Sequence, residues 1–201
     1  MVGDKMRVLI ACEDSGTVRD AFRKLGHEAW SCDFLPNTGG HHFQMDIRDV
    51  LKEYYLKWDM MIAFPDCTHL CVSGARYFKD KIPQQNEALY FIRFLMNIRR
   101  IPKIAIENPV GVISTRIRKP DQIIQPWQFG EDASKKTCLW LKGLPKLIPT
   151  NIIKKERYGN QTPSGQNKLG PSKDRARLRA KTYQGIADAM AEQWGGLVVT
   201  N

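Results

Sequence analysis

The feature that most constrains this chain is its alternation of short apolar runs with segments of helical periodicity. Strands are expected at Arg7–Cys12, His27–Cys32, Trp58–Phe64, Lys103–Glu107 and Thr137–Leu141. Between the first two runs, Val18, Ala21 and Phe22 fall at helical spacing. Such an alternation predicts an α/β fold, with a mainly parallel sheet and helices on both of its faces.

Caps and breakers set the expected boundaries of the remaining elements. The expected helices run from the Ser15 cap to Gly26, from Asp46 to about Leu56, from Pro83 to about Arg99 and from Tyr183 to Trp194. Loops are expected at Phe34–His42, at Asp66–Phe78 and from Asn108 to Gln128, and a last strand at Leu197–Val199. With 201 residues, we expect residues 1–201 to form a single domain.

The positive charge of the chain is concentrated in one segment. The net charge is +10, which suggests a polyanionic partner, and nucleic acid is the first candidate. Between Asn151 and Lys181, nine lysines and arginines stand against two acids. This lies within the Pro/Gly-rich segment 143–181, which we expect to contact phosphates. The alternative is a solvated surface loop.

The cysteines and the apolar segments narrow the class of protein further. Five scattered cysteines, with no secretory signal at the N-terminus, predict free thiols in a reducing cytoplasm. No apolar run reaches the roughly 18 residues of a membrane span. The C-x-H-x-C spacing of Cys67, His69 and Cys71 is not a usual zinc-finger spacing, so we expect no metal site.

Residues that directly follow strands are the first candidates for a site. In open parallel sheets the ligand lies beyond the carboxyl ends of the strands. Those positions hold Glu13 to Gly16, Asp33, Asp46, Pro65 to Cys67 and Glu107 to Pro109. Acids there suit ribose hydroxyls and an exocyclic amine, whereas a thiol and a carboxylate suit chemistry.

Several of these motifs, in this order, resemble the S-adenosylmethionine-dependent DNA (cytosine-5) methyltransferases. The segments most like the family are Pro65-Asp-Cys-Thr-His-Leu70 and Ala105-Ile-Glu-Asn-Pro-Val-Gly-Val-Ile-Ser114. The resemblance covers nearly the whole chain and is greater to short phage and prophage members. It implies a Rossmann-like methyltransferase fold, DNA as the partner and, for a phage-borne protein, the cytoplasm of a bacterial host.

The resemblance also implies where the cofactor S-adenosylmethionine binds. The loop Cys12-Glu13-Asp14-Ser15-Gly16 matches the first glycine motif, whose amides at the helix start would hold the methionine part. Asp33 would accept from the ribose hydroxyls, and Pro65 belongs to the same side. Asp46 matches the residue that pairs with the adenine amine, although it is equally suited to cap a helix.

Three residues are implied in catalysis. Cys67 matches the thiolate that attacks C6 of cytosine, Glu107 the acid that supports N3, and Lys135 loosely matches the basic motif. Asp66 stands where the family has proline, and its carboxylate would raise the pKa of the neighbouring thiol. Cys71 is a second thiol on this loop, but only Cys67 matches the motif.

The target-recognition region is reduced here to a short basic segment. About forty residues, Gly143 to Thr182, occupy the place where the family has roughly a hundred. We expect phosphate contacts from Lys173, Arg175, Arg177, Arg179 and Lys181. Such a loop offers little for base-specific contact, so low sequence specificity is expected on duplex or single-stranded DNA.

Two other functions remain open from the sequence. One is C5 modification of a pyrimidine in RNA or in a free nucleotide, which the short recognition segment favours. The other is a catalytically inactive protein that binds cofactor or DNA, which Asp66 and the imperfect first motif favour. The sequence indicates neither the target site nor the oligomeric state.

Overall fold

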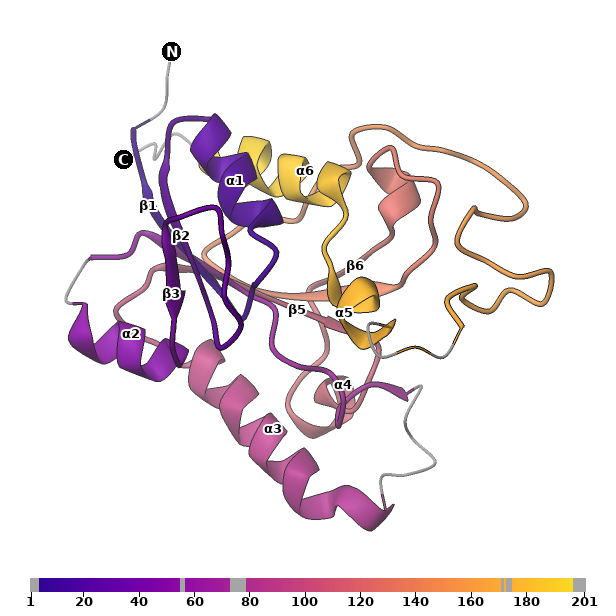
Figure 1. Cartoon of the computed structure of the whole chain (residues 1–201), viewed down its shortest axis with the longest axis horizontal. Helices are drawn as coiled ribbons and strands as arrows, with labels where there is room; N and C mark the ends of the chain where they lie inside the picture. Colours follow the sequence, from indigo (N-terminus) through magenta and orange to yellow (C-terminus); the bar gives the residue numbers. More distant parts are fainter. Residues whose placement is uncertain (1–3, 55–56, 73–78, 171, 173–174, 197–201) are drawn as a thin grey trace.

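One mixed sheet runs through the molecule (Figure 1). The computed structural model describes residues 4–54, 57–72, 79–170, 172 and 175–196, without the side chains of residues 176 and 177. The strands described are β1 (Arg7–Ala11), β2 (Glu28–Asp33), β3 (His42–Gln44), β4 (Met60–Ala63), β5 (Lys103–Pro109), β6 (Gln122–Ile124) and β7 (Thr137–Lys142). Their spatial order is β3-β2-β1-β4-β5-β7-β6.

The strand directions give the sheet its character. From β3 to β5, neighbouring strands pair in parallel, whereas β7 runs antiparallel to both β5 and β6. The chain proceeds outward from β1 to β3 and then returns to β4 on the other side of β1. This is a Rossmann-like α/β fold with a mainly parallel sheet. The fold class expected from the sequence is thereby confirmed.

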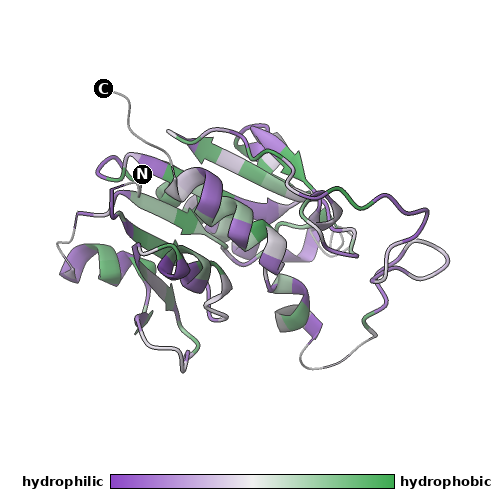
Figure 2. Cartoon of the chain, turned by 90° about the horizontal axis from the view of Figure 1, so that it is seen from above, coloured by the Kyte–Doolittle hydropathy of each residue, from purple (hydrophilic) through white to green (hydrophobic). Residues whose placement is uncertain are grey.

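The helices cover both faces of the sheet. The α-helices are α1 (Thr17–Lys24), α2 (Ile47–Glu53), α3 (Ile82–Met96), α4 (Ile113–Arg116), α5 (Arg175–Ala180) and α6 (Gln184–Gly195), and Pro126–Gln128 form the 3-10 helix η2. Helices α1 and α6 share one apolar cluster with the sheet, and α2, α3 and α4 share the other. The strands are mostly apolar, whereas the helices carry both kinds of residue (Figure 2).

Alternation along the strands supplies both apolar clusters. In β1, Val8 and Ile10 belong to the cluster with α1 and α6, whereas Leu9 and Ala11 belong to the cluster with α2 and α3. Successive side chains of a strand point to opposite faces, so a strand that is apolar throughout fits a sheet covered on both sides. The continuous apolar runs of the sequence reflect this burial.

The segment from 143 to 182 extends beyond the sheet, and part of it projects away from the body in both views (Figures 1 and 2). Hydrogen bonds at several points anchor it to the rest of the chain. The Trp194 indole N–H of α6 donates to the Pro145 carbonyl at 3.0 Å. The side-chain amide of Asn160 exchanges hydrogen bonds of 2.9 Å with the backbone of Ser134 in both directions. The segment therefore lies against the residues that precede β7.

Several expected boundaries were wrong. Strand β3 begins at His42, the last residue of an expected loop, and the stretch from Asn108 to Gln128 contains α4, β6 and η2. Both missed strands have only three residues and lie at the two edges of the sheet, so they are too short to show a period. Helix α1 begins after Gly16 rather than at a Ser15 cap. The strand expected at Leu197–Val199 lies outside the described residues.

Candidate active site

A cleft of about 1000 Å³ opens at the carboxyl ends of β1, β4 and β5. Loop residues Cys12, Glu13 and Asp14 line it after β1, and Pro65 and Cys67 line it after β4. Glu107 lines it from the end of β5, and Lys135 from the segment before β7. Seven of the ten residues implied for cofactor binding and catalysis thus meet at one cavity, whereas Gly16, Asp33 and Asp46 do not line it.

Glu13, in the first loop, caps helix α1 with its own side chain. The carboxylate is 5% exposed and accepts the N–H groups of Val18 at 2.8 Å and Arg19 at 3.4 Å. Ser15 Oγ accepts the Thr17 N–H at 3.2 Å. The amides at the start of α1 are therefore engaged within the chain. The sequence predicts that such amides hold the methionine part of the cofactor, and in this structure a buried acid accepts from two of them.

Gly16 serves the turn into α1. Its φ of 72° is left-handed, and a Cβ at this position would come within 2.4 Å of Arg19 Nη2. A glycine fits here both because φ is positive and because the guanidinium passes so close. Gly16 thus shapes the loop rather than lining the cleft.

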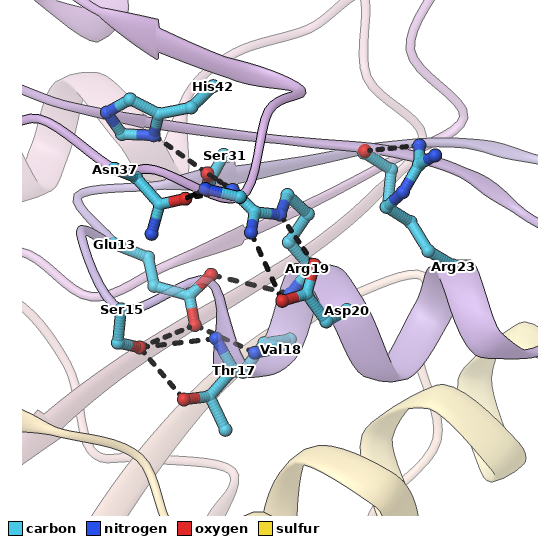
Figure 3. A network of polar contacts seen from close by, with 12 residues as sticks. Glu13, Ser15, Thr17, Val18, Arg19, Asp20, Arg23, Ser31, Asn37 and His42 are labelled. Carbon is cyan, nitrogen blue, oxygen red and sulfur yellow. Dashed lines mark hydrogen bonds and ion pairs between the residues drawn. The ribbon is translucent and has the colours of Figure 1, made fainter.

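Arg19 is the centre of a buried polar network that joins two loops (Figure 3). Its side chain is 1% exposed, and Nη1 donates to Ser31 Oγ at 3.0 Å and to Asn37 Oδ1 at 2.9 Å. Asn37 Nδ2 in turn donates to the Asp14 carbonyl. The network therefore fixes the loop after β1, which lines the cleft, against the loop after β2.

The two acids expected at the cofactor lie near Cys12 but have different partners. Burial raises the pKa of Asp33, although its Oδ1 accepts the Leu35 N–H. Asp46 caps α2 through the Arg48 N–H, and the Arg48 guanidinium lowers the pKa of Asp46. Burial, followed by the charges of neighbouring acids and Cys32, raises the pKa of Cys12 above its usual range. The capping role of Asp46 that the sequence allowed is the one the structure shows.

The Pro65–Cys67 loop is held by turns and by the strand next to it. Asp66 Oδ1 accepts both the N–H and the hydroxyl of Thr68, and the Cys67 carbonyl accepts the Cys71 N–H at 3.0 Å. Asn108 Nδ2, on β5, donates to the Pro65 carbonyl at 2.8 Å. This bond ties the thiol loop to the strand that carries Glu107.

Gly111 permits a further close approach to this loop. The Val112 N–H donates to the Leu70 carbonyl at 2.9 Å, and Cys71 and Gly111 form an isolated bridge. A Cβ on Gly111 would lie 2.1 Å from the Leu70 carbonyl oxygen. Any other residue at 111 would push the two segments apart, because the obstructing atom belongs to the backbone. The family-like Pro-Val-Gly-Val sequence therefore has a packing reason.

The thiol of Cys67 is protonated at neutral pH. Burial raises the pKa of Cys67 to about 11, and the nearby groups of Cys71, Asp66 and Glu107 raise it further, whereas Lys135 lowers it. The effect expected for Asp66 is present, but burial is the larger cause. A nucleophilic role for Cys67 would therefore need removal of this proton or added positive charge.

Glu107 and Asn108 each carry a buried polar atom without a hydrogen-bond partner among the described residues. Glu107 Oε1 and Asn108 Oδ1 have no hydrogen-bond partner among the described residues. Burial raises the pKa of Glu107, against smaller lowering effects of Lys135 and the Thr137 hydroxyl. Buried polar atoms in folded proteins are nearly always satisfied. Both residues line the cleft, so each of these atoms indicates a place for a polar ligand.

Lys135 joins this pocket to helix α5. Its Nζ donates to the Arg179 carbonyl at 3.0 Å, and its N–H donates to Gln125 Oε1 at 2.9 Å. Its charge lowers the pKa values of both Cys67 and Glu107, which places the ammonium group near each of them. Lys135 is therefore positioned both toward the two candidate reacting groups and toward the basic segment.

The basic residues are distributed differently from the expectation. Of the five residues expected to contact phosphates, Arg179 and Lys181 line the cleft, Arg175 lies on α5 without lining it, and Lys173 and the side chain of Arg177 lie outside the description. The exposed Lys136 and Lys168 also line the cleft. Lys168 belongs to the segment expected to contact phosphates but is not one of the five residues named for it, and Lys136 precedes that segment. Their charge was visible in the sequence, but their convergence depends on the anchor between Asn160 and Ser134.

Neither a metal-binding cluster nor a membrane-spanning helix is present among the residues that the structure describes. There, no three His, Cys, Asp or Glu side chains gather so as to hold a metal ion. None of the described helices has the length and apolar character needed to cross a membrane.

Comparison with known proteins adds little to the geometry. No protein-family model and no curated protein matches the chain. Among solved structures, it is similar to a protein described as a candidate DNA modification methyltransferase encoded within a prophage of E. coli. The two are 12% identical with a TM-score of 0.49, and the match covers 74% of this chain. The chain spans about half of that structure, 52% of its length.

Proposed function

We propose that this protein is an S-adenosylmethionine-dependent methyltransferase that modifies C5 of cytosine in DNA. The observation that carries the proposal is the meeting of Cys67 and Glu107 in one cleft, at the ends of the adjacent parallel strands β4 and β5. A thiol and an acid held at one edge of a sheet suit nucleophilic attack with support for the ring nitrogen. The resemblance seen in the sequence assigns the same two residues.

The acids near Cys12 suit the cofactor in part. Asp33 is half-buried with an elevated pKa, and Asp14 lines the cleft, so these groups would accept from hydroxyl and ammonium groups. When bound, S-adenosylmethionine supplies a methyl group from a sulfonium cation, which acidic surroundings favour. The methionine carboxylate needs donors other than the start of α1, because Glu13 engages those amides. Asp46 would accept from the adenine amine while its carboxylate remains paired with Arg48.

Cys67 would act as the nucleophile toward C6 of the base. Addition of its thiolate turns C5 into an enamine-like carbon, which cytosine itself does not provide. After methylation, loss of the C5 proton would let the C6–sulfur bond break and release Cys67. The thiol must first lose its proton, and its pKa of about 11 makes this the demanding step. Lys135, which lowers that pKa, would assist.

Glu107 would bind the base edge and protonate it. Its raised pKa favours a carboxyl group that donates to N3 of cytosine, and the open Oε1 would accept from the exocyclic amine. Proton donation to N3 withdraws electrons from C6 as the thiolate attacks. The open Oδ1 of Asn108 would accept a further donor.

DNA is the polyanion that the cleft suits best. The exposed Lys136, Lys168, Arg179 and Lys181 surround the opening, as expected for phosphates on either side of a bound nucleotide. Several cations around one cleft favour a polymer, with many phosphates, over a free nucleotide.

One observation favours a second candidate, a catalytically inactive protein that binds the same ligands. The pKa of Cys67 lies far above neutrality, and Asp66 contributes to this. A thiol so rarely ionised would be a slow nucleophile unless DNA binding changes its surroundings.

The experiment that tests the proposal is mass spectrometry of nucleosides after incubation with cofactor and unmethylated DNA. We expect 5-methylcytosine from the unmodified protein and from Cys71→Ser, and none from Cys67→Ser. If RNA or nucleotides are modified and DNA gains no 5-methylcytosine, the substrate is RNA or a free nucleotide rather than DNA. Absence of any product would favour the inactive protein, and calorimetry would then show whether it still binds S-adenosylmethionine. In that assay, Asp33→Ala should weaken binding by about 1–3 kcal/mol.

A further inference from the structure

Three exposed apolar side chains stand at the opening of the cleft, among its basic residues. Val72, Leu169 and Leu178 are 55%, 37% and 56% exposed, and all three line the cleft. They share this opening with Lys136, Lys168, Arg179 and Lys181. Exposed apolar groups beside cations are costly in water, but they suit a ligand that is both anionic and aromatic.

Leu178 is the best placed of the three to enter such a ligand. It belongs to α5, and the next residue, Arg179, accepts a hydrogen bond from Lys135 Nζ through its carbonyl at 3.0 Å. Lys135 also acts on the pKa values of Cys67 and Glu107, so this contact holds α5 beside the pocket for the base. The helix that carries Leu178 is therefore held next to the candidate reacting groups.

A cytosine in duplex DNA cannot reach this pocket while it is stacked. Glu107 Oε1 and Asn108 Oδ1 are buried at the end of β5, so the base must leave the helix to reach them. Extruding a base costs a few kcal/mol, and proteins that unstack DNA insert apolar side chains such as leucine between base steps. The surrounding cations would hold the phosphates on either side while the gap is filled.

We propose that Leu178 inserts into the base stack of duplex DNA at the position the target cytosine vacates. The inference rests on the proposed function, and it identifies duplex DNA as the substrate. Single-stranded DNA needs no side chain to fill a gap. The contribution of Leu178 should therefore depend on whether the DNA is paired.

The test compares methyl transfer to native and heat-denatured DNA of the same sequence by the unmodified protein, Leu178→Ala and Leu178→Phe. We expect Leu178→Ala to lower the initial rate on duplex DNA by tenfold or more and to leave the rate on denatured DNA within twofold. Leu178→Phe, which keeps an apolar side chain, should retain most of the duplex rate. Ile148→Ala is the matched control, because Ile148 is 70% exposed and does not line the cleft.

A second readout needs no methyl transfer. Duplex DNA that carries a fluorescent cytosine analogue brightens when the analogue is unstacked, and we expect the unmodified protein but not Leu178→Ala to produce this signal. Equal loss of rate on paired and denatured DNA, or unchanged fluorescence in Leu178→Ala, would overturn the role of Leu178. Brightening without any methylated product would instead retain that role and refute the proposed catalysis.

Discussion

Two strand ends in the same cleft differ in how their polar groups are satisfied. After β1, the Glu13 carboxylate accepts two backbone N–H groups and the Ser15 hydroxyl, and Arg19 connects this loop to the next. At the end of β5, Glu107 Oε1 and Asn108 Oδ1 have no partner among the described residues. The first end is closed by the fold itself, and the second is left open. We infer that the first end holds the shape of the cleft and the second receives the ligand.

Glu107→Gln should show the largest difference between its effect on methyl transfer and its effect on the free energy of unfolding. A glutamine keeps the shape but cannot give up a proton, so methyl transfer should fall by about 100- to 10,000-fold. The free energy of unfolding should change by less than about 1 kcal/mol, because glutamine keeps an oxygen that can accept from the Thr137 hydroxyl. Rates and chemical denaturation on the same preparation check both numbers. A large loss of stability with activity retained would reverse the roles of the two strand ends.

Arg19→Ala should show the opposite pattern. It removes hydrogen bonds from a guanidinium that is 1% exposed and leaves Ser31 and Asn37 with fewer partners. We expect the free energy of unfolding to fall by about 2–3 kcal/mol. Methyl transfer by the protein that remains folded should fall only a few-fold. Arg23→Ala, on the same helix but largely outside the network, is the control. If Arg19→Ala inactivated a fully stable protein, Arg19 would belong to the site.

The salt dependence of DNA affinity tests whether the lysines that line the cleft contact phosphates. The plot of log affinity against log salt has a negative slope. Lys136→Ala and Lys168→Ala should each make that slope shallower by about 0.9 for duplex DNA, if each lysine contacts one phosphate. Lys52→Ala removes the same charge from α2, away from the cleft, and should leave the slope unchanged. Equal effects of all three substitutions would mean that net charge, rather than the cleft, attracts DNA.

Asp66→Asn should have the smallest effect on methyl transfer, and it should raise the rate rather than lower it. The pKa of Cys67 is about 11, so the thiolate fraction rises about tenfold per pH unit below that value. Removing the exposed carboxylate lowers this pKa, and we expect methyl transfer near neutral pH to rise about threefold. Glu107 must keep its proton, so its deprotonation sets a falling limb at higher pH that Glu107→Gln should abolish. A pH–rate profile of each variant checks both limbs, and a decrease in Asp66→Asn would contradict this assignment.

The parallel core was predictable from sequence because its strands are buried on both faces. Runs such as Val8–Ala11 and Met60–Ala63 are apolar and buried throughout, which few other structures explain. His42–Gln44 has one buried apolar residue, Phe43, and so gave no pattern. Edge strands can be this short because they pair on one side alone.

The site was predictable where a residue directly follows a strand, and less so where a side chain reaches across the fold. Cys67 and Glu107 meet because adjacent parallel strands end at one edge. Glu13 was assigned to the cofactor, although an acid a few residues before a helical run is also a capping signal. Lys136 and Lys168 converge through hydrogen bonds between distant segments, which leave no pattern along the chain.

The most direct test of the account is trapping with duplex DNA that contains 5-fluorocytosine. After methyl transfer, fluorine at C5 cannot leave as a proton does, so the bond between C6 and the attacking thiol persists. In the presence of S-adenosylmethionine, we predict a complex that survives denaturation and a modified peptide that carries the base on Cys67. An adduct on Cys71, or no adduct in a protein that binds both cofactor and DNA, would contradict the claim that Cys67 is the nucleophile.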